Sequence, residues 1–174
     1  MNNLVERMVR AARLDAQVYE EVEADTRATG QAMTVVVVSS VAAGVGTLAA
    51  GGVVGLLVTT FFALIAWYVW ALMTYWIGTR LLPEPQTKAD VGELLRTTGF
   101  SSAPGVVRIV GIVPGMTKLV FLLAGIWMLI TMVVAVRQAL DYSGTARAVG
   151  VCAIGWGIQA GLLVLLFSLF RLAD

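Results

Sequence analysis

The residues from Gln31 to Gly78 form a stretch of 48 residues without a charged side chain. A helix rises about 1.5 Å per residue and the hydrocarbon core of a bilayer is about 30 Å thick, so about 20 residues cross it once. The stretch is therefore long enough for two crossings. The sequence AAGG at residues 49–52 divides it, because glycine ends helices readily. We expect a first span at about 31–49 and a second at about 53–78.

The composition of the whole chain also indicates an integral membrane protein. Hydrophobic residues make up 59% of its 174 residues and charged residues 13%, whereas soluble proteins carry about 45–50% and about 25%. The net charge of +1 gives no basic field that would attract nucleic acid. Arginine outnumbers lysine ten to two, and alanine, glycine and valine are abundant, which is typical of a GC-rich bacterial genome.

Three further apolar segments follow, and we expect spans at about 101–115, 118–137 and 147–170. The first of these carries Arg108 between two prolines, so it fits either a short third span or a re-entrant loop. The distribution of basic residues favours the span. With five crossings and a cytoplasmic N-terminus, nine lysines and arginines lie inside, two lie outside and Arg108 is in transit, in accord with the positive-inside rule. We therefore expect an all-α polytopic protein with five transmembrane helices and an external C-terminus.

Two polar segments are predicted to form amphipathic helices at the membrane interface. Residues 1–30 form a cytoplasmic N-terminal segment, and residues 88–98 form a cytoplasmic helix within the transmembrane domain (31–174). In the cytoplasmic N-terminal segment, three arginines at a spacing of three residues lie on a different helical face from the apolar residues. Such a helix either lies in the interface or packs on its own protein, and the sequence leaves both open. Thr87 and Asp90 resemble a capping box for the second helix. The apolar residues of the first helix are Leu4, Val5, Met8, Val9 and Ala12.

The sequence offers little that could carry catalysis or hold a metal. It has no histidine, and its single cysteine, Cys152, lies within an apolar run. Zinc requires cysteine, histidine or clustered carboxylates at ligand spacing, and nucleophilic catalysis requires a nucleophile beside a base. No such pattern and no phosphate-binding GxxxxGK[ST] loop occurs in the sequence. We expect a protein that is not an enzyme and has no catalytic, metal-binding or cofactor-binding residue.

Charged residues that this topology places on the cytoplasmic side are candidates for partner binding and for ion pairs. Arg137 and Asp141 stand four residues apart and can pair if their helix continues that far. The candidate partners for Arg108 are the carboxylates of Glu23, Asp25, Asp90, Glu93 and Asp141. The cytoplasmic group comprises Glu20, Glu23, Asp25, Arg27, Asp90, Glu93, Arg96, Arg137, Asp141 and Arg147.

Two further groups lie within the spans. Arg108 and Gln159 are polar side chains at membrane depth, where ionisable residues are costly and commonly functional. Glycines at GxxxG spacing let helix backbones approach closely, either inside the bundle or against a partner. The glycine pairs are Gly51 with Gly55, Gly111 with Gly115, and Gly157 with Gly161.

Longer strings of the sequence are similar to those of a known family. They are YEEVEADTRATGQAMTVVVVSS, YWIGTRLLPEPQTKADVGELLRTTGFSSAPGVVRIVGIVPG and IWMLITMVVAVRQALDYSGTARAVGVCAIGW. Over about residues 18–160 the chain resembles bacterial members of the YIP family, the Ypt/Rab-interacting membrane proteins. The resemblance implies five transmembrane helices, a cytosolic N-terminus and no enzymatic activity. Eukaryotic members are linked to Rab GTPases, vesicle trafficking and membrane shaping, and their DLYGP-type motif does not occur here.

We therefore expect a non-catalytic scaffold or adaptor of the YIP type, located in the bacterial cytoplasmic (inner) membrane. Its cytoplasmic face, residues 1–30, 80–100 and 137–147, would bind a protein partner or organise the bilayer. Two alternatives stay open. One is an accessory subunit of a larger membrane complex or homo-oligomer, packed through glycine faces. The other is a small channel or transporter in which Arg108 and Gln159 line a path for an anion or a neutral solute.

Overall fold

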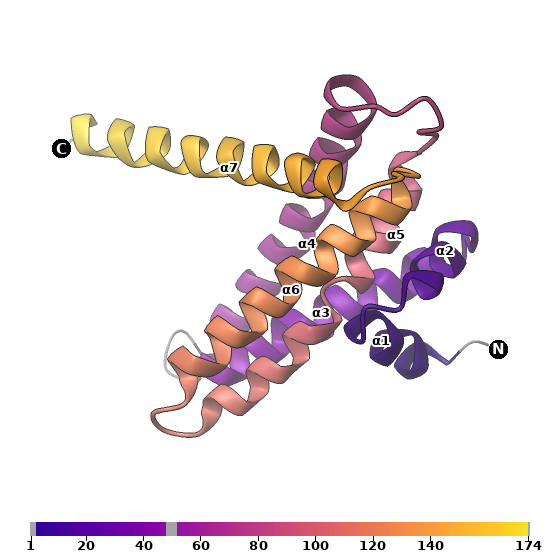
Figure 1. The fold of residues 1–174 in the computed structure, drawn as a ribbon. Coiled ribbons are helices and arrows are strands. Elements are labelled where there is room, and N and C mark those ends of the chain that lie inside the picture. Colours follow the sequence, from indigo (N-terminus) through magenta and orange to yellow (C-terminus); the bar gives the residue numbers. More distant parts are fainter. Residues whose placement is uncertain (1–2, 48–51, 174) are drawn as a thin grey trace.

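The computed structural model describes residues 3–47 and 52–173, and every regular element within these ranges is a helix (Figure 1). The all-α fold expected from the sequence is therefore confirmed. Two of the elements are not α-helices: η1 is a π-helical turn and η2 is a 3₁₀ helix. In chain order the helices are α1 (Leu4–Ala12), α2 (Ala16–Ala24), α3 (Ala28–Thr47), α4 (Gly52–Trp76), η1 (Ile77–Leu81), α5 (Val91–Phe100), η2 (Ala103–Ile112), α6 (Thr117–Ala139) and α7 (Thr145–Ala173).

Three helices in the described part of the chain are found to be long and apolar enough to cross a membrane. They are α3, the continuous α4–η1 helix (Gly52–Leu81), and α6. The second of them ends three residues beyond the expected boundary at 78, because η1 prolongs α4 without a break. Pro83 follows almost at once, and proline cannot continue a helix. The chain is thus an integral membrane protein whose apolar helices contact lipid.

Helices α5 and η2 form one interrupted path through the bundle, and this path runs from the far end of α4–η1 to the start of α6 (Figure 1). Asp90 Oδ1 accepts from the backbone N–H of Glu93 at 2.8 Å, and Glu93 Oε2 accepts from the N–H of Asp90 at 2.7 Å. This capping box lies three residues later than the expected one at Thr87, because Asp90 is itself the N-cap. Pro104 in the first turn of η2 separates the two helices, since it has no N–H to extend α5.

Helix α5 is buried, whereas its sequence pattern predicted a helix over 88–98 lying along the membrane. It packs against α2, α3, α4 and α6, so its polar residues are enclosed together with its apolar ones. Two threonines tolerate burial because their hydroxyls bond to carbonyls one turn back, Thr97 to Glu93 at 3.0 Å and Thr98 to Leu94 at 2.5 Å. The buried residues of α5 are Leu94, Arg96, Thr97, Thr98, Gly99 and Phe100.

Small residues let the α5–η2 path lie directly on α3. A Cβ atom at Gly105 would collide with Oγ of Ser39, and a Cβ atom at Gly46 would collide with the carbonyl oxygen of Arg108. The backbones therefore approach more closely than side chains would allow. The facing residues are Gly99, Gly105 and Gly111 on the α5–η2 side and Ala32, Ser39 and Gly46 on α3.

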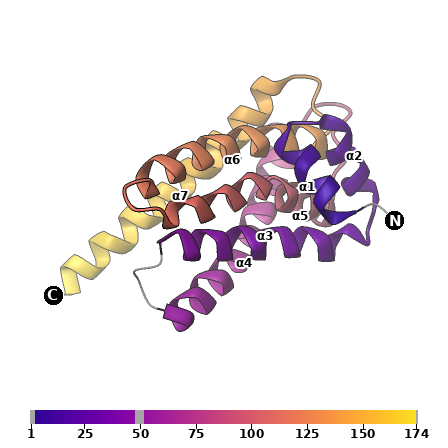
Figure 2. The same ribbon diagram turned by 90° about the horizontal axis from the view of Figure 1, so that it is seen from below.

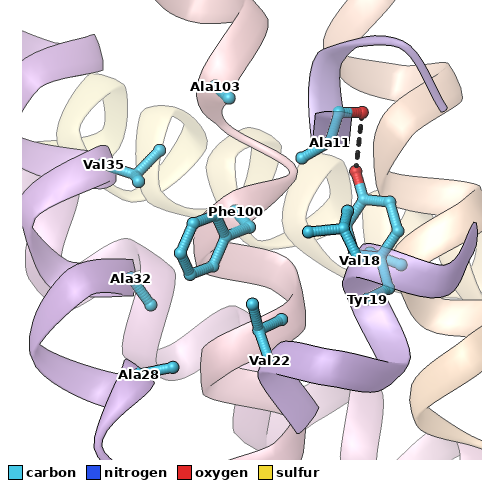
Figure 3. Close-up of a cluster of buried hydrophobic side chains, with 10 residues drawn as sticks. Ala11, Val18, Tyr19, Val22, Ala28, Ala32, Val35, Phe100 and Ala103 are labelled. Atoms are coloured by element: carbon cyan, nitrogen blue, oxygen red, sulfur yellow. Dashed lines mark hydrogen bonds between the residues drawn. The ribbon is translucent and has the colours of Figure 1, made fainter. Parts of the chain in front are cut away.

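The two short N-terminal helices pack beside the end of the bundle at which α3 begins (Figure 2). A buried apolar cluster joins them to α3 and α5, and within it the hydroxyl of Tyr19 donates to the carbonyl oxygen of Ala11 at 3.2 Å (Figure 3). The burial raises the pKa of Tyr19 and keeps its hydroxyl protonated. The cluster consists of Ala11, Val18, Tyr19, Val22, Ala28, Ala32, Val35, Phe100, Ala103 and Ala135.

Helix α1 turns a different side to the bundle from the one its apolar pattern predicted. Arg7 is buried, whereas Val5 is 61% and Val9 is 44% exposed. The guanidinium of Arg7 donates to Oε1 of Gln31 at 2.8 Å and to Oδ2 of Asp25 at 3.0 Å. These bonds hold the arginine face inward, so part of the apolar stripe points away from the protein.

The last helix, α7, packs on the bundle only with its first half (Figure 1). Trp156 stacks on Trp70 of α4 with ring centroids 6.1 Å apart, and Gly155 lies against the same indole. The next six residues, 157–162, are all exposed. Helix α7 therefore leaves the other helices shortly after Trp156.

Candidate interaction site at the polar end of the bundle

A polar cavity of about 880 Å³ lies where α2, α5, the connection before α5 and the end of α6 meet. We call the end of the bundle that holds this cavity its polar end. It brings together segments that are far apart in the sequence. Half of the charged residues predicted for the cytoplasmic face line it, namely Glu20, Glu23, Glu93, Arg137 and Asp141. The remaining lining residues are Ala24, Pro85, Gln86, Lys88, Gln138 and Tyr142.

Hydrogen bonds between these segments hold the walls of the cavity in place. The amide of Gln138 on α6 donates to Oε1 of Glu20 on α2 at 2.8 Å. The amide of Gln86 donates to the carbonyl oxygen of Asp141 at 3.2 Å, and the backbone N–H of Lys88 donates to Oδ2 of Asp141 at 3.4 Å. The cavity is therefore framed by direct contacts from α6 to both α2 and the connection before α5.

The expected pairing of Arg137 with Asp141 required the helix to continue, and α6 ends at Ala139. Asp141 has a φ of 53°, the left-handed conformation that asparagine and aspartate tolerate better than most residues. Arg137 instead donates to the carbonyl oxygens of Tyr142 at 3.4 Å and Ser143 at 3.3 Å. The arginine thus stabilises the turn after α6, and the carboxylate of Asp141 stays at the cavity.

The cavity lining is acidic, and this shifts the ionisation of Glu23. Partial burial, together with the negative charges of Glu93, Asp141 and Glu20, raises the pKa of Glu23 to about 7, against the opposing charge of Arg96. Four carboxyl groups therefore share one space with two cations, Lys88 and Arg137. At neutral pH the cavity changes its net charge with the protonation of Glu23.

Arg96 was predicted as an interaction residue, but it is buried behind the cavity. Its Nε donates to the carbonyl oxygens of Val22 at 2.9 Å and Glu23 at 3.0 Å, and its Nη2 also donates to Glu23. These are carbonyls in the last turn of α2, where a cation is favourable because of the helix dipole. Arg96 therefore positions α2 and, with it, the side chain of Glu23.

Asp25 and Arg27 follow the last residue of α2 and do not line the cavity. Asp25 pairs with Arg7 at 3.0 Å and with Arg27 at 3.6 Å. The hydrogen bond from Arg7 is the main cause that lowers the pKa of Asp25. Arg7 was not among the predicted functional residues, although the face that it shares with Arg10 and Arg13 was noted. It ties α1 to the start of α3.

Arg147 belongs to a second group of contacts, which ties the start of α7 to the connection before α5. It pairs with Glu84 at 3.4 Å and donates to the carbonyl oxygen of Pro83 at 2.7 Å. Glu84 also accepts from the backbone N–H of Ser143 at 2.9 Å, and this contact lowers its pKa. Glu84 was not among the residues predicted from the sequence. Its position between Pro83 and Pro85 is the one feature of the sequence that marks it. Asp90, also predicted, acts as the N-cap of α5.

The two intramembrane polar residues, Arg108 and Gln159, line one hollow together. The guanidinium carbon of Arg108 lies 5.5 Å from the centre of the Phe121 ring. Among the described residues no carboxylate pairs with Arg108, so the expected ion pair with a cytoplasmic acid does not form. The reason is distance along the bundle, because those acids gather at its polar end.

The predicted glycines have different surroundings. Gly111 packs on α3, and Gly115 has a φ of 84° in the turn before α6. Gly55 lines a hollow between α3 and α4, and Gly51 lies outside the described residues. A Cβ atom at Gly157 or Gly161 would meet nothing within 4 Å. The chain itself therefore does not use this last pair for close packing.

Comparison with known proteins gives one finding for the chain as a whole. The model of the Yip1 domain matches residues 15–167. No curated protein and no solved structure matches the chain. Within the described ranges no three histidine, cysteine, aspartate or glutamate side chains are placed to hold a metal ion.

Proposed function

Because the chain belongs to the Yip1 family of membrane proteins, we propose that it is a non-catalytic membrane scaffold or adaptor that binds a soluble partner at its polar end. The observation that carries this proposal is the acidic cavity of about 880 Å³ framed by α2, α5 and the end of α6. Its four carboxyl groups against two cations favour a partner segment that carries lysine or arginine.

The proposed topology has five crossings, with the N-terminus and the cavity in the cytosol of a bacterium and the C-terminus outside the cytoplasmic membrane. In this topology α3, α4–η1 and α6 provide the first, second and fourth crossings. Helices α5 and η2 together provide the third crossing. Ten residues of α-helix and ten of 3₁₀ helix cover about 15 Å and about 20 Å, enough for a hydrocarbon core of about 30 Å. Helix α7, with 29 residues, is long enough for the fifth crossing.

Site-specific photocrosslinking in intact cells tests the partner-binding function. A photoreactive residue at Ala24, which lines the cavity, should crosslink to a soluble protein. The matched control is Gln17, which is exposed on the same helix but does not line the cavity. A second arm carries Glu20→Lys beside the probe at Ala24, and reversal of this charge should lower the crosslink yield. Equal crosslinking from both probe positions, unaffected by Glu20→Lys, would refute the proposal.

A second candidate function, membership in a larger membrane complex or homo-oligomer, is favoured by one observation. Residues 157–162 of α7 are exposed, and Gly157 and Gly161 lie open on that helix. Open glycines in a lipid-facing helix offer a surface for close helix packing. Extraction in a mild detergent, followed by purification, should then yield a partner or second copy in fixed stoichiometry. Gly161→Leu should release it.

A further inference from the structure

Arg108 lies inside the bundle without a counter-charge. The sequence has no aspartate or glutamate in residues 26–83 or 94–140, which include both sides of η2. The Nε atom of Arg108 is buried and has no hydrogen-bond partner in the part of the chain that the structure describes. The contact with the ring of Phe121 attracts the cation but does not satisfy this N–H. A buried donor of this kind is costly unless a ligand or water completes it.

Arg108 lines two neighbouring hollows of about 320 and 280 Å³. Both hollows also contact Met128 on α6 and Trp156 on α7. Met128 is about 16 Å along α6 from its first residue, near the middle of that helix. The larger hollow adds the hydroxyl of Ser102 and the amide of Gln159. A cation and neutral donors therefore meet apolar walls at membrane depth.

One side of these hollows is bordered by the point at which α7 leaves the bundle. Trp156 packs on Trp70, and the next six residues are exposed. Gln159 is among these exposed residues and also lines the larger hollow. The site is therefore reachable from the side, where a bilayer would surround the protein.

We propose that the two hollows form a binding site for a phosphate-bearing anion, which the guanidinium of Arg108 holds. Guanidinium is a planar fork of N–H donors that matches phosphate oxygens, and it keeps its charge in a low-dielectric surrounding. The headgroup of an anionic phospholipid and free phosphate share this chemistry. The lipid would enter beside α7 with its acyl chains against Met128, Leu129 and Met132. The site is separate from the cavity at the polar end and does not depend on a partner there.

Native mass spectrometry of the full-length protein in detergent tests the site with three probes. They are dioleoylphosphatidylglycerol, dioleoylphosphatidylcholine with the same chains, and inorganic phosphate. We expect the wild-type protein to retain phosphatidylglycerol over phosphatidylcholine, and Arg108→Gln to weaken that retention at least about tenfold. Arg108→Lys keeps the positive charge but loses the planar fork of N–H donors. Its affinity for phosphatidylglycerol should therefore lie between those of the wild type and Arg108→Gln.

A variant that fills the hollow tests the same site with the arginine intact. Gly125 lines the smaller hollow, and a Cβ atom there meets nothing within 4 Å. Gly125→Leu should therefore exclude the ligand. Gly30→Leu is the matched control, because Gly30 is equally open within a helix but lines neither hollow. The melting temperatures of both variants in detergent report whether the fold is preserved.

The outcomes distinguish a lipid site, a phosphate site and the absence of either. Loss of phosphatidylglycerol in Arg108→Gln and Gly125→Leu, without binding of inorganic phosphate, assigns the site to a lipid headgroup. Binding of inorganic phosphate that both substitutions abolish assigns it to free phosphate. If folded Arg108→Gln and Gly125→Leu retain all three probes as the wild type does, the proposal is overturned.

Discussion

Arg96 and Arg108 both lie inside the helix bundle, and their surroundings differ in one decisive respect. Arg96, near the polar end, donates to two carbonyl oxygens in the last turn of α2. Arg108, deeper in the bundle, has a buried Nε without a partner among the described residues. The fold supplies hydrogen-bond acceptors for Nε of Arg96, and within the described residues it supplies none for Nε of Arg108. The comparison teaches that burial alone does not identify a binding residue, because the acceptors that the fold supplies to each buried donor must be considered as well.

The largest expected effect on stability comes from replacing Arg96. Arg96→Met takes away the hydrogen bonds to Val22 and Glu23 and leaves their carbonyls unpaired, so we expect a loss of about 3 kcal/mol in the free energy of unfolding. The control is Arg108→Met. This substitution removes no hydrogen bond donated by Nε, so the free energy of unfolding should fall by less. Reversible unfolding in mixed micelles measures both. Equal losses for the two variants would remove the distinction between the arginines.

Close packing beside Arg108 gives the next effect. Gly46→Ala places a methyl group against the carbonyl oxygen of Arg108, and because a backbone atom cannot move away freely, we expect a loss of about 2 kcal/mol. Gly157→Ala, at an open helical site, should be neutral or slightly stabilising, since alanine favours helix. Thermal unfolding of the two variants in the same detergent checks this prediction. A stable Gly46→Ala would show that η2 does not rest on α3.

A pH-dependent effect belongs to the polar end. The pKa of Glu23 is about 7 in the folded protein and lies near 4.5 when unperturbed. Between these values the folded state binds the proton more strongly than the unfolded state, so stability falls as the pH rises from about 4.5 to about 7. Glu23→Gln imitates the protonated form and should be more stable than wild type at pH 8, by about 1 kcal/mol after solvent screening.

The measurement for Glu23 is the unfolding midpoint of wild type and Glu23→Gln at pH 5 and pH 8. The two proteins should agree at pH 5 and separate at pH 8. A constant difference at both pH values would indicate that the carboxyl group does not titrate in this window.

The smallest effect is expected at the outer edge of the polar end. Arg27 pairs with Asp25 at 3.6 Å, but its side chain is 95% exposed. Arg27→Ala should therefore change stability by less than about 0.5 kcal/mol. Arg7→Gln breaks the buried partner of the same carboxylate and should be clearly more destabilising in the same assay. A reversed order would contradict the burial that distinguishes these two arginines.

The sequence predicts the helices of this protein well where a single physical cause dominates. The charge-free stretch and the run before Arg137 correspond to α3, α4 and α6, because apolar length decides a crossing. It predicts α5 less well. The narrow stripe of Leu94 and Leu95 pointed to a surface helix, but a threonine that bonds to its own helix is as easily buried as a valine.

The candidate site is only partly readable from the sequence, for the same kind of reason. The charges of Glu20, Glu93 and Asp141 are visible in the sequence, but their meeting in one cavity depends on how α2, α5 and α6 pack. The roles of Arg7 and Arg96 depend on carbonyls and side chains that the fold brings to them. For Arg108 the sequence shows the missing counter-charge and cannot show the hollows beside it.

The contacts of η2 with α3 limit how this molecule can move. Small residues face each other at three successive levels, from Gly99 to Gly111, and the backbones touch at Gly46. A shift of η2 along its axis would push larger side chains into these close contacts at all three levels together. A rearrangement that widens or narrows the space around Arg108 is therefore expected from the other walls, which α4, α6 and α7 form, and not from η2.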